Sequence, residues 1–252
     1  MKSVVLFLGL LLFPVAASAD VITLSGTGTT SGNLLSASAT FDITGDILTI
    51  TLSNTAAYNY AADGQLTPAE LLSGVFWTWS TGGATLTPLS ATVAAGSIVQ
   101  GSTCSTALCT SSTTNVGGEF RYDSGSWAFA PGTTNGVAGS GYIGGAANLN
   151  GPDLDFPTAV SGMNFGIAPS GFVAGNGNGG VDNEPLIVGP VTFRFSGATG
   201  LLASNINNVV FTYGTSPDAT IQVPEPATLS FLGLGLLGAA SLFRKKAKTN
   251  LT

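Results

Sequence analysis

From Ala37 to Ile43, and again from Leu48 to Leu52, apolar and polar residues alternate one by one. This period of two is typical of β-strands that bury one face. The segment Thr44-Gly45-Asp46 between the two runs favours a tight turn, because Gly45 adopts positive φ at no steric cost. The pattern therefore predicts a β-hairpin with its apolar face in a core.

Seven further stretches have the short, apolar-rich composition of strands and are separated by Gly, Pro and Asn. They are Val21–Leu24, Val75–Trp79, Thr85–Val93, Glu119–Tyr122, Val160–Ile167, Leu186–Phe195 and Val209–Tyr213. Thr67 is a typical N-cap, and Glu70 would complete a capping box around Pro68, so we expect one short helical turn there. The Gly- and Asn-rich stretches 124–155 and 168–184 are predicted to be long surface loops. These elements predict an all-β fold, an antiparallel β-sandwich or jelly roll, as one domain over residues 20–222.

The N-terminal residues 1–19 have the three parts of a secretory signal peptide. Lys2 gives the charged start, Val4–Val15 the apolar centre, and Ala17-Ser18-Ala19 a small-residue cleavage site before Asp20. We therefore expect cleavage after Ala19. The alternative is an uncleaved anchor helix.

The C-terminal residues 223–248 combine a Pro-rich segment, an apolar run and a basic cluster. The run from Leu229 to Phe243 contains no charge, and four cations follow it at positions 244, 245, 246 and 248. A helix of this length comes close to the thickness of a bilayer core. The charge bias places its tail in the cytoplasm and the body outside. We therefore expect a transmembrane helix over residues 228–243.

The tail resembles the PEP-CTERM sorting signal of bacterial surface proteins. Pro224, Glu225 and Pro226 match its recognition motif, and Arg244, Lys245 and Lys246 match its basic stop. The resemblance implies processing by an exosortase-type protease in the inner membrane, a transient anchor, and a mature product at the cell surface or in a polysaccharide matrix. The alternative is a permanently anchored protein in which the Pro-rich segment is a rigid spacer. The hairpin and the stretches 71–77 and 205–215 also resemble a recurring group of exosortase-dependent surface proteins.

Charge and composition exclude several classes of function. The expected exported body, residues 20–222, has twelve acidic residues and two arginines, a net charge of −10, so nucleic acid is not an expected partner. The chain contains no histidine, which excludes Ser-His-Asp and Cys-His catalysis. Carboxylate pairs remain, and the pairs Glu119/Asp123 and Asp153/Asp155 leave a glycosidase as a lesser alternative. We expect no catalytic activity.

Two further hypotheses concern a cross-link and a cation. Cys104 and Cys109 are the only cysteines, and in an exported protein they are expected to form a disulfide. No cofactor is expected, with calcium as a weak alternative because two Gly- and Asn-containing stretches offer oxygen ligands. The candidate calcium ligands are Asp153, Asp155, Asp182 and Glu184.

Aromatic residues raise the possibility of sugar binding. Trp77 and Trp79 would share one face of a strand, and Trp127 lies in a Gly-rich stretch. Paired Trp and Phe residues usually belong to a core, and we expect this of these rings; the alternative is that they are exposed and stack on sugars. The expected function is thus an exported structural protein of the cell surface or matrix. The alternative is a carbohydrate-binding module for extracellular polysaccharide.

Overall fold

The computed structural model describes residues 20–30, 32–93, 98–100, 115–139, 143, 147–151, 166–182, 186–215 and 219–224, and all structural statements concern these residues. Their strands form two sheets of five and nine strands. The predicted all-β class is confirmed.

The five-stranded sheet has the strand order β1-β2-β3-β12-β5, and all its neighbouring pairs are antiparallel. Its strands are β1 (Asp20–Thr30), β2 (Asn33–Thr44), β3 (Ile47–Asn54), β12 (Val191–Ser196) and β5 (Thr87–Val93). β2 and β3 form the predicted hairpin: Thr44 pairs with Ile47, and Gly45 has a φ of 62°. The alternating apolar residues of both strands are buried, as predicted.

The nine-stranded sheet is built around β4 (Leu72–Trp79). One edge of β4 pairs with β13 (Ile206–Tyr213), which in turn pairs with β14 (Ala219–Gln222). The other edge of β4 pairs with two strands, and each of them begins a branch of the sheet. One branch consists of β8 (Asn135–Gly139), β7 (Phe120–Asp123) and β9 (Ala147–Asn148), in this order. The other branch consists of β10 (Gly166–Ala168), β11 (Leu186–Val188) and β6 (Ile98–Gln100). β10 and β11 are parallel. The prediction of an antiparallel sandwich is therefore wrong for this pair of strands.

Short helical segments accompany the strands. The 3-10 helix η1 (Pro68–Glu70) stands at the predicted place, and the Glu70 carboxylate accepts hydrogen bonds from the Thr67 backbone N–H and hydroxyl. A one-turn helix, α1 (Tyr60–Asp63), and a second 3-10 helix, η2 (Ala203–Asn205), have no counterpart in the prediction.

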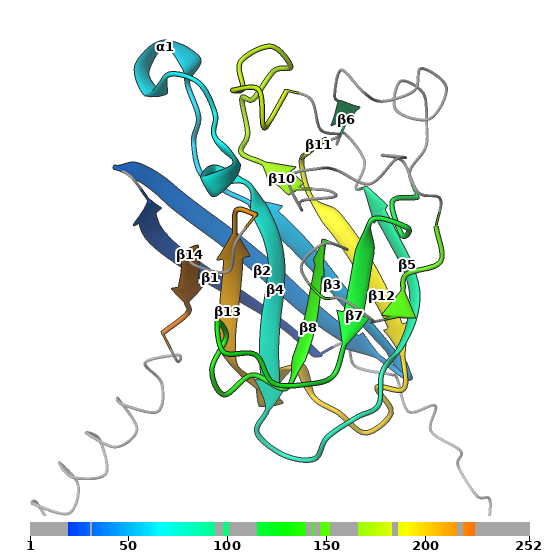
Figure 1. Cartoon of the computed structure of the whole chain (residues 1–252). Helices are drawn as coiled ribbons and strands as arrows, with labels where there is room; N and C mark the ends of the chain where they lie inside the picture. Colours follow the sequence, from blue (N-terminus) through cyan, green and yellow to red (C-terminus); the bar gives the residue numbers. More distant parts are fainter. Residues whose placement is uncertain are drawn as a thin grey trace, which may run out of the picture.

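The two sheets pack face to face, and β1, β2 and β3 cross behind β13, β4 and β8 (Figure 1). Aromatic side chains bridge the interface. Phe41 of β2 meets Trp77 of β4 with ring centroids 5.6 Å apart, and Phe120 of β7 meets Phe193 of β12 at 4.9 Å. Burying a large apolar side chain contributes about 1.5–3 kcal/mol, so this shared core holds the sheets together.

The prediction of a surface loop over 124–155 is wrong, because β8 and β9 lie within it. β8 is a central strand whose five residues are all buried. Its glycines masked the strand signal in the sequence, and they are needed for packing: a Cβ at Gly136 would collide with the Phe76 ring.

The predicted strand Leu186–Phe195 is two strands, β11 and β12, which belong to different sheets. They separate at Gly189-Pro190, where Gly189 has a φ of 115° and proline has no N–H to donate. The other predicted loop is confirmed over 169–182, although Phe172 and Val181 are buried within it. Of the predicted strand Val160–Ile167, residues 160–165 lie outside the described residues.

Candidate functional site

The first strand and the last strand of the described chain lie beside each other. β1 begins at Asp20, the residue after the predicted cleavage site, and its carboxylate accepts a hydrogen bond of 3.3 Å from the Ser204 N–H. β14 lies beside β1, and Ile221 packs onto Gly26, where a Cβ would come within 2.7 Å of it. Ala17 and Ala19 lie outside the described residues.

Val223, the first residue of the predicted tail, still packs against the body. The Val223 N–H donates a 2.8 Å hydrogen bond to the Val209 carbonyl, and the Val223 side chain is only 7% exposed. Pro224, the next residue, is exposed. The predicted Pro-Glu-Pro motif therefore begins directly after the buried Val223.

Comparison with known families identifies this tail. Residues 222–246 match the family described as the PEP-CTERM protein-sorting motif. The chain carries a PEP-CTERM sorting motif. The match includes all six predicted motif residues, of which Glu225, Pro226, Arg244, Lys245 and Lys246 lie outside the described residues. No curated protein and no solved structure matches the chain.

The PEP-CTERM motif indicates export, processing by an exosortase-type system and sorting to the cell surface. Among the described residues, no helix is long and apolar enough to cross a membrane. The predicted transmembrane helix over 228–243 lies outside those residues and stays a prediction.

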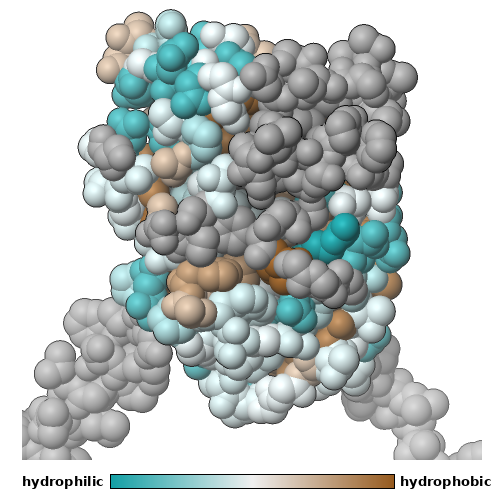
Figure 2. Space-filling model, in the orientation of Figure 1, coloured by the Kyte–Doolittle hydropathy of each residue, from teal (hydrophilic) through white to brown (hydrophobic). Residues whose placement is uncertain are grey.

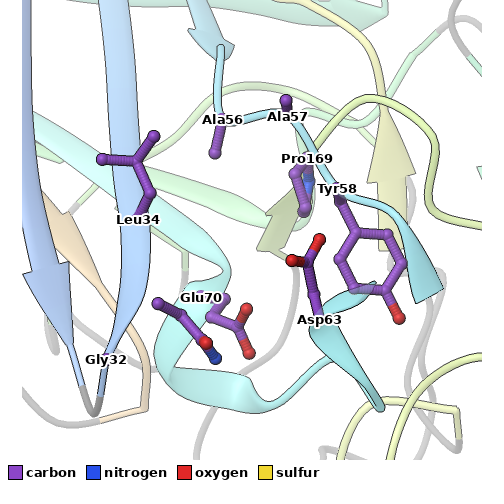
Figure 3. A pocket seen from close by; sticks show the side chains of 9 residues that line it. Gly32, Leu34, Ala56, Ala57, Tyr58, Asp63, Glu70 and Pro169 are labelled. Carbon is purple, nitrogen blue, oxygen red and sulfur yellow. The ribbon is translucent and has the colours of Figure 1, made fainter. Parts of the chain in front are cut away.

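A pocket of about 220 Å³ opens at one end of the sandwich. Its walls come from residues 32–34 at the turn between β1 and β2, residues 56–58 after β3, and Pro169 after β10. In Figure 3 the carboxylates of Asp63 and Glu70 lie at the hollow, between Leu34 on one side and the Tyr58 ring on the other. No sequence pattern indicates this pocket, because its residues come from four separate segments.

Backbone groups hold the pocket residues in place. The Asn59 N–H donates to Asp63 Oδ2 at 2.6 Å, and the Tyr58 hydroxyl lies 2.8 Å from the Gly64 carbonyl oxygen. Burial raises the pKa of the Tyr58 hydroxyl, and the negative charges of Glu70 and Asp63 raise it further. Within the described residues, no group of three His, Cys, Asp or Glu side chains could hold a metal ion. Through the carboxylates of Asp63 and Glu70, the pocket can accept hydrogen bonds from a small polar group.

The residues predicted to bind calcium are not brought together in the described part of the chain. Asp182 Oδ1 accepts hydrogen bonds from the N–H groups of Gly175 and Gly177, at 3.0 and 3.1 Å, and so closes its own loop. Asp153, Asp155 and Glu184 lie outside the described residues, as do Cys104 and Cys109 of the predicted disulfide. The disulfide stays a prediction.

The carboxylates of the pair Glu119/Asp123 come from β7 and the residue just before it. Glu119 is buried at 1% exposure, just before β7, and Asp123 is the last residue of that strand.

Two of the three predicted sugar-stacking residues are in the core. Trp77 is fully buried between the sheets, and Trp79 is 8% exposed, so neither ring presents a face to a sugar. The core interpretation is thus confirmed for both, because their side chains lie on the inner face of β4 and pack in the core that the two sheets share. Trp127 is half-buried, with its ring centroid 4.8 Å from that of Phe76.

Proposed function

We propose that this chain is a non-catalytic structural protein of the cell surface or extracellular matrix, delivered by two removable terminal segments. The PEP-CTERM motif at residues 222–246 is the observation that carries the proposal. In this scheme residues 1–19 are removed after Ala19, and a helix over 228–243 holds the chain in the inner membrane. An exosortase-type protease then releases the body near Pro224-Glu225-Pro226.

The chemistry of the body supports a non-catalytic role. The chain has no histidine, and its body has no lysine, so most acid–base and nucleophilic mechanisms lack their usual residues. Of the acid pair Glu119/Asp123, Glu119 is only 1% exposed and is not accessible to a polymer substrate.

The sorting part of the proposal is tested by intact-mass measurement and cell fractionation with and without the sorting protease. With the protease, we expect a product that starts at Asp20, has lost the basic tail, and leaves the inner membrane. The variant Pro224→Ala/Glu225→Ala/Pro226→Ala should stay in the inner membrane with its tail intact. Thr220→Ala, an exposed change on β14 just upstream of the match, is the matched control and should be processed normally. A mature protein that keeps Arg244–Lys246 would contradict the proposal.

As partner of the exported body we propose extracellular polysaccharide, so that the protein acts as a carbohydrate-binding component of the matrix. The net charge of −10 over residues 20–222 repels acidic polymers and favours an uncharged one. With Trp77 and Trp79 in the core, a sugar-contacting surface has to be sought elsewhere on the molecule.

A further inference from the structure

The outward side of the five-stranded sheet carries an unbroken row of threonines. The paired positions that cross the sheet are Thr23 (β1), Thr40 (β2), Thr51 (β3), Thr192 (β12) and Thr92 (β5). Thr23 is exposed and the other four are half-buried, whereas their chain neighbours Ala39, Leu52 and Phe193 point into the core. One residue type therefore repeats across every strand of the sheet.

Hydroxyl residues continue on one side of this row. The next row along the strands is Ser25, Ser38 and Ser53, and beyond it the hydroxyl oxygens of Ser36 and Thr55 lie 2.7 Å apart. We call the threonine row, the serine row and this last pair the threonine face. On its other side the next row contains Asp42 and Arg194, the only charged residues in the rows named here.

The outer side of the other sheet is different. There Phe76, Ala138 and Val210 form an apolar cluster, and Trp127 and Phe129 from the segment between β7 and β8 pack onto it. Figure 2 shows this side of the molecule, on which brown apolar patches lie among polar residues. On this side Thr78 and Thr134 form one hydroxyl pair at 2.9 Å, whereas the row of threonines through every strand belongs to the five-stranded sheet.

The threonine face has the hydrogen-bonding chemistry of an uncharged sugar polymer. Side chains on one face of a strand recur about every 6.8 Å, and neighbouring strands lie about 4.8 Å apart, which sets the hydroxyls in a regular grid. Thr23 and Thr40 hydroxyl oxygens are 2.9 Å apart. The hydrogen bond within such a pair uses one of the two hydroxyl hydrogens, so the pair keeps one donor and free lone pairs for a ligand. The threonine methyl groups between them can contact the C–H groups of sugar rings.

We infer that the threonine face binds an extended, neutral polysaccharide. An acidic polymer is disfavoured by the negative body, and a row of side chains that crosses five strands suits an extended polymer better than a single sugar. A second copy of the chain is a weaker occupant, because facing threonine rows would bury little of the large apolar surface that drives protein association. The inference rests on the proposed function, since the face meets such a polymer only outside the cell.

Co-sedimentation of the purified full-length chain with microcrystalline cellulose and with curdlan, two insoluble neutral glucans, tests the inference. We expect saturable binding to at least one of them and none to alginate gel, which is acidic. The variant Thr40→Val/Thr51→Val/Thr192→Val removes three hydroxyls and keeps the side-chain shape and strand preference. Its Kd should rise roughly 100-fold, the effect of three lost hydrogen bonds.

The matched control changes three exposed threonines away from the face, Thr85→Val/Thr215→Val/Thr220→Val, and should bind like the parent. Thr51→Ser keeps the hydroxyl and should also bind. Equal melting temperatures of the variants show that the fold is kept, and if the triple variant unfolds, Thr51→Val alone should still weaken binding about fivefold.

Absence of binding to both glucans, or equal binding by the triple variant, would overturn the inference. So would a dimer in sedimentation velocity that dissociates in the triple variant, since the face would then join two copies. Sorting is measured separately by mass and fractionation: an uncut chain that still binds glucan contradicts the sorting proposal alone.

Discussion

At the scale of single residues, β8 depends on a glycine where the Phe76 ring crosses it. A Cβ at Gly136 would collide with two carbons of that ring, and the ring is fixed by Trp127 and Phe129 on its other sides. Gly136→Ala should therefore lower the free energy of unfolding by about 1–3 kcal/mol. Gly83→Ala is the control, because a Cβ there meets nothing within 4 Å. Equal urea midpoints for the two variants would show that the ring can move aside.

Two buried tyrosines make the fold sensitive to alkali. Burial raises the pKa of the Tyr122 and Tyr213 hydroxyls, whereas in the unfolded chain this pKa is about 10. Above about pH 10 the unfolded state loses protons that the folded state keeps, so stability is full below that pH and falls as pH rises. The expected slope is about 1.4 kcal/mol per pH unit for each tyrosine.

Urea unfolding at about pH 8 and about pH 11 measures this slope. The variant Tyr122→Phe lacks one of the two hydroxyls, so its free energy of unfolding should fall less between the two pH values than that of the parent. Equal unfolding free energies of the parent at both values would contradict the prediction.

At the scale of elements, the sequence was sufficient where the determinants are local. The hairpin from β2 to β3 and the capping box at Thr67–Glu70 are set by residues a few positions apart. β8 and the parallel β10–β11 pair were missed because their partners are distant: Gly136 pairs with Phe76, and Gly166 with Leu186. The core position of Trp77, which is usual for paired aromatic residues on a strand, is confirmed.

β14 limits where the chain can be cut without damage to the fold. Ile221 and Val223 are 5% and 7% exposed, and each buried side chain of this kind contributes about 1.5–3 kcal/mol. A cut before Ile221 would remove both, so we expect the mature C-terminus to lie beyond Val223. Mass spectrometry of the C-terminal peptide measures it, and a product that ends at or before Thr220 would refute the prediction.

At the scale of the whole molecule, sequence and structure reveal different parts of the function. The PEP-CTERM motif is linear, so its residues could be recognised before any fold was known. The threonine face draws on five strands that are separated by as many as 169 positions, from Thr23 to Thr192, and only the pairing register brings them into one row. The Asp63/Glu70 pocket is likewise assembled from separate segments.

The shared core predicts that the two sheets unfold together. Trp77 contacts Phe41 across the interface, and the ring centroids of Tyr122 and Phe195 are 5.0 Å apart. Neither sheet therefore keeps its apolar face covered without the other. Tryptophan fluorescence, which reports on the interface around Trp77, and far-ultraviolet circular dichroism, which reports on strands, should give the same urea midpoint. In Trp127→Phe the fluorescence comes only from Trp77 and Trp79, and the coincidence should persist. Two separate transitions would mean that each sheet is stable alone, and they would contradict a single core shared by both sheets.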